Sequence, residues 1–460
     1  MESGEKMKCV ARWIAVLLCL CLIGLGVVAC TKHTVDEPDD KEPDFETGSE
    51  KESESSLESE TESEKESESS LETEPEEERK EPVNMDTMIN YRASLEHTYR
   101  RLTEDKELTV AYFGGSVTAG YGASNANRYS WRALVGKWFS TEFPDAEIRN
   151  INLALGESGT YLGAYRVPLD VITAQPDLLF IEYSINDFYY KSTYQQAASQ
   201  YETIIREVKT ALPDTDIVTI LVTDRSCLGT NQLGKLHTQA QAHEDIAKAY
   251  HIPTIHAGHY LAATAEYSYA NWHKYAIDVV HPNDAGYEVY FQIIREFLRK
   301  SLLDTDFSLP QQQFVMSPII SDSLFDGNRN VIIPSQTLLA ESETLGGTGV
   351  TWVDELSYSN TNSRGRFLFD HADDTLAFKL NGTEVAAYLM NGDTRDPLLV
   401  SIDGSEYQKV TRDKHNPTML ASGLESGEHI VKIKMQNASR VYVGAIFVRD
   451  ETLATSKGTE

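Results

Sequence analysis

Apolar and polar residues follow two different patterns along the chain, and the first runs from Met85 to about Leu303. There, short apolar runs of strand type are separated by longer segments with helical spacing. The predicted strands are 108–113, 148–155, 178–183, 217–222 and 253–255. The predicted helices are 131–143, 161–173, 194–212, 235–250 and 283–302, with a short one before the first strand, between Met88 and Tyr99. This alternation predicts an α/β domain with a parallel sheet covered on both faces.

After Leu303 the helical spacing gives way to short alternating runs punctuated by turn pairs. The predicted strands are 376–380, 385–389, 398–402, 429–435 and 441–448. The turn pairs are Asn381-Gly382, Asn391-Gly392, Asp403-Gly404 and Ser426-Gly427. We therefore expect an all-β sandwich or jelly roll, joined to the α/β domain through residues 310–334.

The role of this second domain is open on the sequence alone. Its aromatic residues could stack on sugars or fill the core between the sheets; they are Trp352, Tyr358, Tyr388, Tyr407 and Tyr442. A structural lid or accessory domain packed against the first domain is the alternative. A sandwich fold by itself indicates no function.

The N-terminus has the features of a secretory signal. Basic residues precede an apolar run from Trp13 to Ala29, and the run ends at Cys30. The sequence Val27-Val-Ala-Cys30 resembles the bacterial lipoprotein signal, which implies lipidation of Cys30. An uncleaved anchor helix is the alternative. Both interpretations place the folded part at the extracellular face of the cell membrane.

Acidic residues are concentrated between Val35 and Val83, with 22 acidic and 5 basic residues, so this segment supplies about half of the net charge of -30. Its repeats of Lys-Glu-Ser-Glu-Ser-Ser-Leu-Glu contain almost no apolar residue, which predicts a disordered tether rather than a core. Calcium collection is an alternative role.

The expected domains are a signal peptide at 1–30, the tether at 31–84, the α/β domain at 85–303, a connection at 304–334, the β-domain at 335–450 and a tail at 451–460.

Cysteine and histidine usage predicts no metal site and no cofactor. After removal of the signal and lipidation of Cys30, only Cys227 is left, so neither an intramolecular disulfide nor a cysteine-based metal site is possible. His256 and His259 share one loop but lack further ligands at suitable spacing. We expect no nucleic-acid partner, and the sequence does not indicate the oligomeric state.

Four polar segments follow the ends of predicted elements. Gly114-Gly115-Ser116 follows the first strand, Gly156 follows the second, Asn186-Asp187 follows the third, and Asp278-Val-Val-His281-Pro282 precedes the last helix. Taken singly, each also fits an ordinary turn or helix cap. Together they place a hydroxyl, an amide, an acid and an imidazole where ligands bind in an open α/β sheet.

These four segments resemble the four sequence blocks of the SGNH hydrolases, also called the GDSL esterase and lipase superfamily. The resemblance covers roughly 106–300 and implies a flavodoxin-like three-layer sandwich. It also implies that Ser116 is the nucleophile, His281 its general base and Asp278 the residue that orients His281. The oxyanion hole would combine the amides of Ser116 and Gly156 with the side chain of Asn186.

Two positions depart from the family's pattern. Residue 115 is Gly where the name-giving motif has Asp, a change that many carbohydrate esterases of the family share. Glu157 stands where a small residue is more usual, and it adds negative charge near the site.

The cleft could also include Ser158, Thr160 and Arg166. An ordinary α/β-hydrolase is disfavoured, because residue 118 is Thr and the Gly-x-Ser-x-Gly elbow is missing.

We expect a surface-tethered serine esterase that removes small acyl groups, such as acetyl, from a polysaccharide. A lipid anchor, a long spacer and an added β-domain suit a polymeric substrate. The same residues serve lysophospholipases, thioesterases and acyltransferases, so these activities are alternatives. An inactive glycan-binding surface protein is a further alternative, which the presence of Ser116, Asp278 and His281 together disfavours.

Overall fold

A computed structural model describes residues 83–304, 314–321, 329–332, 334–353, 366–390, 396–413, 417–437 and 440–449. The predicted signal peptide, Cys30 and nearly all of the acidic segment lie outside these ranges, as does Tyr358. Within the described ranges, no helix has the length and apolar character needed to cross a membrane.

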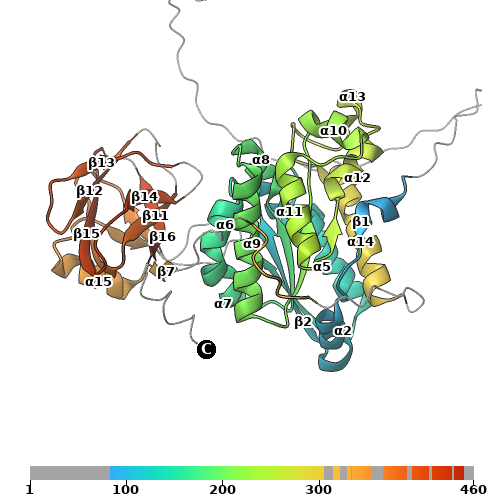
Figure 1. Ribbon diagram of the computed structural model, residues 1–460, viewed down its shortest axis with the longest axis horizontal. Coiled ribbons are helices and arrows are strands. Elements are labelled where there is room, and N and C mark those ends of the chain that lie inside the picture. The colour runs from blue at the N-terminus through green and yellow to red at the C-terminus, as the bar shows by residue number, and fades with distance from the viewer. Residues whose placement is uncertain are drawn as a thin grey trace, which may run out of the picture. The chain divides into compact units, whose positions relative to one another are not determined.

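A six-stranded sheet forms the centre of the first part of the chain (Figure 1). Its strands are β1 (Ile89–Asn90), β2 (Glu107–Gly114), β3 (Glu147–Asn152), β4 (Leu178–Glu182), β5 (Asp216–Ile220) and β6 (Thr254–Ile255). The spatial order is β1-β6-β5-β4-β2-β3, and β2 to β6 run parallel. Numbered along the chain, these five parallel strands lie in the order 2-1-3-4-5, which is that of flavodoxin-like folds. The predicted fold class is therefore confirmed.

Helices cover both faces of this sheet (Figure 1). They are α2 (Glu96–Arg100), α3 (Ser116–Ala119), α4 (Ala126–Tyr129), α5 (Trp131–Glu142), α6 (Thr160–Arg166), α7 (Ile172–Ala174), α8 (Ser184–Tyr189), α9 (Tyr194–Ala211), α10 (Leu228–Gln232), α11 (Thr238–Ala249), α12 (Ala257–Thr264), α13 (Tyr269–Trp272) and α14 (Asp284–Leu302). Successive residues of β2 enter two different cores, as the pleat of a strand requires. Val110 and Tyr112 pack with α5, α12 and α14, whereas Ala111 and Phe113 pack with α6, α9 and α11.

The segment before β2 differs from its prediction. The helical spacing between Met88 and Tyr99 predicts one helix, but only α2 is α-helical there, after a 3₁₀ turn η1 (Met85–Met88) and before a π-helical turn η2 (Arg101–Asp105). Ile89 pairs instead with Ile255, antiparallel to β6. This pairing satisfies backbone groups that a helix would otherwise satisfy internally, and it makes the sheet mixed at that edge.

Two further helical turns interrupt the predicted pattern. Helix α6 continues into a π-helical turn η3 (Val167–Val171), where Pro168 lacks the amide that a regular helix would use. A 3₁₀ turn η4 (Arg225–Cys227) follows β5, and Cys227 is a buried free thiol there.

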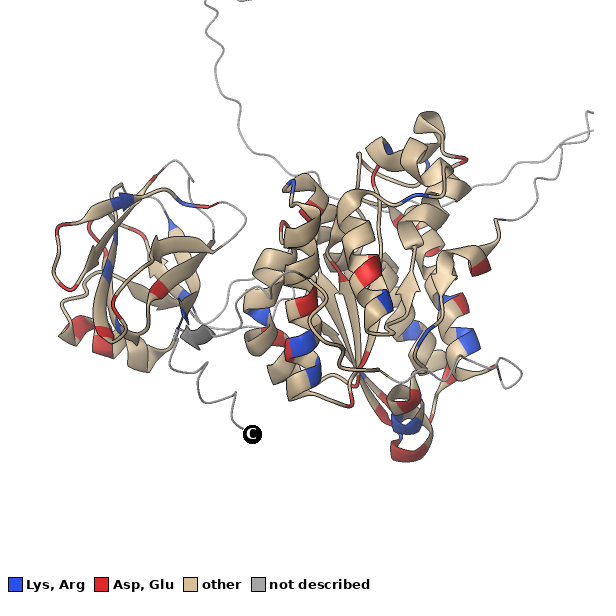
Figure 2. Ribbon diagram, viewed as in Figure 1, with Lys and Arg blue, Asp and Glu red and all other residues tan. Residues whose placement is uncertain are grey.

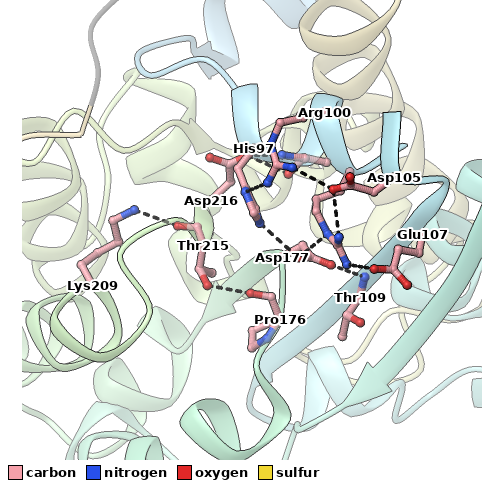
Figure 3. Close-up of polar contacts among 12 residues, drawn as sticks. His97, Arg100, Asp105, Glu107, Thr109, Pro176, Asp177, Lys209, Thr215 and Asp216 are labelled. Carbon is pink, nitrogen blue, oxygen red and sulfur yellow. Dashed lines mark hydrogen bonds and ion pairs between the residues drawn. The ribbon is translucent and has the colours of Figure 1, made fainter. Parts of the chain in front are cut away.

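Polar contacts hold the amino ends of the strands together. The carboxylate of Asp177, just before β4, accepts hydrogen bonds from Thr109 N at 2.7 Å and Arg101 Nε at 2.9 Å, and lies 3.1 Å from His97 Nε2 (Figure 3). A cleft of about 430 Å³ at this end includes His97 and Asp216 in its lining. The residues that follow the carboxyl ends of the strands do not line this cleft.

Charged residues of both signs are interspersed over the helices of this part of the chain (Figure 2). The described part thus has a more balanced surface than the acidic segment 35–83, as the distribution of charge along the sequence predicts.

The second part of the chain consists mainly of antiparallel strands. They are β7 (Arg329–Ile332), β8 (Thr351–Val353), β9 (Arg366–Phe369), β10 (Thr375–Asn381), β11 (Glu384–Met390), β12 (Leu398–Ile402), β13 (Gln408–Val410), β14 (Thr418–Ala421), β15 (Glu428–Met435) and β16 (Val441–Arg449), with one helix, α15 (Gln336–Thr344). One sheet has the order β10-β15-β12-β13; the other has β14-β11-β16-β9-β8, and β7 pairs with β16. Buried residues such as Phe378 on β10 and Val443 on β16 share one core, so the two sheets form the predicted sandwich.

The turn and aromatic predictions for this part have mixed outcomes. Asp403-Gly404 has positive φ at both residues, 53° and 78°, the backbone form that favours Asp-Gly in a tight hairpin. Tyr442 is buried, and Trp352 packs against the core, edge-on to Phe367. Tyr407 is more exposed, and the ammonium of Lys434 lies 4.8 Å from its ring centroid.

Strand β7 falls inside the range predicted as a connection. The other domain boundaries stay predictions.

Candidate active site

Ser116 lies immediately beyond the carboxyl end of β2, at the first residue of α3. The turn before it depends on a close approach of two backbones. A Cβ atom at Gly114 would lie 2.4 Å from the carbonyl oxygen of Glu182 and 2.5 Å from Thr118 Oγ1, which only glycine avoids. The glycine pair thus turns the chain sharply enough to present the Ser116 hydroxyl at the edge of the sheet.

His281 and Asp278 reach Ser116 from the loop before α14. Ser116 Oγ lies 2.8 Å from His281 Nε2, and His281 Nδ1 lies 2.7 Å from Asp278 Oδ2. The side chain of His281 is 18% exposed and that of Asp278 is 41% exposed. The structure therefore brings the three predicted residues into one hydrogen-bonded relay, although 165 positions separate Ser116 from His281.

Backbone contacts fix the acid of this relay. Asp278 Oδ1 accepts hydrogen bonds from the amides of Val280 and His281, each at 2.8 Å. Burial alone would raise the pKa of Asp278, but these amides and the His281 side chain together lower it below its usual range. An ionised Asp278 favours the tautomer of His281 that carries its proton on Nδ1, which leaves Nε2 free to accept a proton.

Two aromatic residues support the base and the nucleophile. The ring of Tyr121 packs edge-on against that of His281, with 4.5 Å between centroids. The hydroxyl of Tyr287, on α14, donates to the carbonyl oxygens of Val117 and Tyr121 at 3.0 and 2.7 Å. Tyr287 therefore ties the helix after His281 to the turn that carries Ser116.

Gly156 and Asn186 both lie beside Ser116. A Cβ atom at Gly156 would be 3.8 Å from Ser116 Cβ, and a Cβ atom at Gly115 would be 2.3 Å from Asn186 Oδ1. In the described part of the chain, the backbone amides of Ser116 and Gly156 have no hydrogen-bond acceptor. Free amides and a side-chain amide around a hydroxyl are the donors that an oxyanion needs.

A buried polar network holds Asn186 and the Gly156 loop in place. Asp187, which follows Asn186 on α8, accepts hydrogen bonds from Thr160 N at 2.8 Å and Thr160 Oγ1 at 2.7 Å. Its Oδ2 also lies 2.9 Å from His243 Nε2, and both side chains are 1% exposed. The sequence shows Asp187 as part of a motif but does not indicate its partner, because the histidine appears only as one residue on the buried face of α11.

Glu182 is a second buried group that the sequence does not single out as functional. It ends β4, and its Oε2 accepts a hydrogen bond from Thr118 Oγ1 at 2.8 Å, two residues after Ser116. Among the described residues, its Oε1 has no partner. Burial raises the pKa of Glu182 to about 8, although hydrogen bonds from Thr118 and Gly115 act in the opposite direction. At neutral pH this side chain is therefore mainly a neutral acid beneath the nucleophile turn.

The other residues considered for the cleft lie elsewhere. Ser158 and Arg166 are buried: Ser158 Oγ donates to the carbonyl oxygen of Leu155, and Arg166 Nη2 donates to that of Leu153. Thr160 is buried as well, so all three are structural rather than cleft-lining. Glu157 is exposed and has a φ of 55°.

The two loop histidines have protein partners. His256 Nε2 lies 3.2 Å from Glu244 Oε2, and His259 Nε2 lies 3.1 Å from Tyr267 Oη. Across the described ranges, no group of three or more His, Cys, Asp or Glu side chains could hold a metal ion.

A known sequence family matches the part of the chain that contains this site. Residues 112–289 match the sequence model of the GDSL-like Lipase/Acylhydrolase family. This range begins within β2 and ends within α14, so it contains every residue of the site described above. A comparison with curated proteins finds no significant match.

Several solved structures are similar to the chain. A two-domain esterase, CEX, described as active on acetylated mannans, has 19% identity and a TM-score of 0.59, over 80% of this chain and 98% of that one. Its structure co-crystallised with mannopentaose has 18% identity and the same TM-score of 0.59, over 80% and 99%. Axe2, an acetylxylan esterase from Geobacillus stearothermophilus, has 17% identity and a TM-score of 0.36, over 42% and 94%. The likeness to the two-domain esterase shows that the α/β and β parts share its fold.

Proposed function

We propose that this chain is an ester hydrolase that removes acetyl or similarly small acyl groups from a polysaccharide at the outer face of the cell membrane. The match of residues 112–289 to the sequence model of the GDSL-like lipase/acylhydrolase family supports ester hydrolysis. The relay from Ser116 through His281 to Asp278, with distances of 2.8 and 2.7 Å, is the observation that carries this proposal.

In the proposed reaction, Ser116 Oγ attacks the ester carbonyl and its proton passes to His281 Nε2. Asp278 stabilises the imidazolium that forms, because its carboxylate faces Nδ1. The negative charge that develops on the carbonyl oxygen is held by the amides of Ser116 and Gly156 and the side-chain amide of Asn186. His281 then gives its proton to the departing sugar oxygen, which leaves as a hydroxyl group, and an acyl group is left on Ser116.

In the second half of the cycle, water is the nucleophile and Ser116 is the leaving group. His281 takes a proton from the water molecule, the hydroxide attacks the acyl carbonyl, and Ser116 leaves with the proton returned from His281. Such a cycle needs neither a metal nor a cofactor.

The proposed substrate class is supported by fold and by architecture. CEX is described as active on acetylated mannans, and the likeness to it extends over both of its domains. An appended β-domain suits a polymer better than a small diffusible ester. The test is the release of acetate from acetylated glucomannan by the purified protein and by its Ser116→Ala variant. Serine-dependent release supports the proposal, whereas activity only on long-chain acyl esters would place the substrate among lipids.

The proposed location is supported by Val27-Val-Ala-Cys30 after an apolar run and by the acidic segment that follows. Lipid on Cys30 would hold the protein on the membrane, and the segment would extend the esterase away from it. In the native host, Cys30→Ala should abolish incorporation of a labelled fatty acid and release the protein from membranes. Incorporation that persists in this variant would exclude Cys30 as the lipidated residue.

A further inference from the structure

Some of the exposed apolar side chains belong to the loop of His281 or to segments that contact it. Five large apolar residues with 39 to 60% exposure come from loops and short helices at the carboxyl ends of the strands; they are Tyr121, Tyr189, Tyr269, Ile277 and Val279. Soluble proteins seldom expose grouped apolar side chains without a binding role.

Direct contacts connect these residues to the relay. Tyr121 packs against the ring of His281. The amide of Arg225 donates to the carbonyl oxygen of Val279 at 2.8 Å, which joins the turn after β5 to the loop of Asp278. The hydroxyl of Tyr189, at the end of the helix that carries Asn186, donates to Asp224 Oδ2 at 2.6 Å. The exposed side chains therefore belong to one connected surface beside the relay.

Arg225 lies on this surface, and no ion pair joins it to a carboxylate among the described residues. Its guanidinium carbon lies 5.6 Å from the centroid of the Tyr269 ring, and Nη1 lies 3.2 Å from His273 Nε2. Tyr269 and His273 are both exposed. A guanidinium has five N–H donors, and stacking over an aromatic ring does not use them. Most of the Arg225 donors therefore stay available for a ligand.

We propose that Arg225 and Tyr269 form a subsite for the main chain of the polysaccharide, next to the acyl group that Ser116 attacks. This inference rests on the proposed function. The apolar face of a pyranose ring packs on the Tyr269 ring, and the Arg225 guanidinium donates hydrogen bonds to neighbouring hydroxyl oxygens of the same chain.

The charge around the subsite favours an uncharged glycan. Asp278 belongs to the relay with Ser116, and the exposed Glu157 follows Gly156, which lies beside Ser116. These carboxylates would repel a polymer of uronic acids, whereas a neutral hexose chain has no charge for them to repel.

The test compares Arg225→Gln and Tyr269→Ala with the parent protein on acetylated glucomannan and on 4-nitrophenyl acetate. Each variant should raise KM for glucomannan about tenfold, the loss typical of one stacked or charge-assisted contact, and change kcat/KM for the aryl acetate much less. Tyr99→Ala is the matched control, because Tyr99 is 49% exposed on α2 at the amino ends of the strands. Equal losses on both substrates, or no loss on glucomannan, would overturn the subsite.

A binding measurement separates the subsite from the esterase proposal. Titration of mannopentaose into the Ser116→Ala protein needs no hydrolysis, and Arg225→Gln and Tyr269→Ala introduced into that background should each weaken binding about tenfold. Unchanged affinity in both variants would overturn the subsite even if acetate release is confirmed. Weakened affinity with no acetate release from glucomannan would retain the subsite and reject the proposed activity.

Discussion

At the scale of single residues, Gly115 departs from the name-giving motif of the family that the sequence resembles, and its surroundings give a reason for glycine. A Cβ atom there would be 2.3 Å from Asn186 Oδ1 and 3.4 Å from the carbonyl oxygen of Ser158. An aspartate in place of Gly115 would therefore push the side-chain amide of Asn186 away from Ser116. The close approach of Asn186 depends on the missing side chain.

Gly115→Ala should therefore lower kcat on 4-nitrophenyl acetate by about 10- to 100-fold and change KM little, because a displaced donor no longer meets the oxyanion. Gly229→Ala is the matched control, since no atom lies within 4 Å of a Cβ built at Gly229 in α10. The measurement is kcat and KM of both variants in steady-state kinetics. Parent-like kcat in Gly115→Ala would mean that Asn186 is not held by this contact.

Glu182 supplies a prediction about pH. Its pKa is raised to about 8 in the folded protein from an ordinary value of 4.5, so folding retains a proton that the unfolded chain loses above pH 4.5. The free energy of unfolding should therefore fall as pH rises from 4.5 to 8, by roughly 5 kcal/mol for this group, and then level off.

Glu182→Gln removes this dependence because glutamine imitates the neutral acid and still accepts the hydrogen bond from Thr118. The stability of the variant relative to the parent should thus increase between pH 5 and pH 8 and stay constant above pH 8. Urea unfolding at four pH values measures it. Two parallel stability curves would show that Glu182 is ionised in the folded protein at neutral pH.

The sequence predicts the residues of the relay and of the oxyanion hole, but not the residues that support them. Ser116, Asp278 and His281 stand in motifs whose order and spacing resemble a known family. Glu182 and His243 stand in ordinary strand and helix patterns, 64 and 56 positions from the residues they contact. Their role depends on contacts that no local pattern encodes.

At the scale of elements, the periodicity of the sequence predicts most strands and long helices of the α/β part to within a few residues. The helix predicted at 194–212 is Tyr194–Ala211, and the strand predicted at 178–183 is Leu178–Glu182. Short elements are predicted less well. Helix α8, which carries Asn186, has six residues, too few to show helical periodicity, and β1 exists only because it pairs with β6.

A buried carboxylate helps to hold the segment 314–321, within the predicted connection, to the α/β part. Glu202 on α9 accepts hydrogen bonds from Tyr250 Oη at 2.5 Å, Ile320 N at 2.8 Å and Ser321 N at 2.7 Å. Burial alone would raise the pKa of Glu202, but these bonds lower it overall. The stabilisation they provide is present above the ordinary pKa of glutamate and is lost as pH falls below it.

Glu202→Ala should therefore lower the free energy of unfolding by about 3 kcal/mol at pH 7, because it removes several hydrogen bonds to a charged group. The difference from the parent should shrink below pH 4.5. Gln195→Ala, at an exposed position of the same helix, is the control. A loss in Glu202→Ala that is equal at pH 7 and pH 3.5 would mean that the carboxylate charge does not contribute.

At the scale of the whole molecule, the change of pattern near Leu303 predicts the change from an α/β fold to a β-sandwich, and the likeness to a two-domain esterase confirms both folds. The sandwich contains strands that the sequence does not predict, such as β13 and β8, because three residues are too few for alternation to be recognised. The lipid anchor and the acidic tether lie outside the described residues and stay predictions from composition.

The proposed activity depends on Ser116 as the nucleophile. The most direct measurement is the rate of 4-nitrophenyl acetate hydrolysis by the parent protein and by Ser116→Ala, with circular dichroism to show that both are folded. The relay of Ser116, His281 and Asp278 predicts a loss of kcat on the order of 10³ to 10⁶ in the variant. A folded Ser116→Ala protein that hydrolyses the ester at the parent rate would contradict the account.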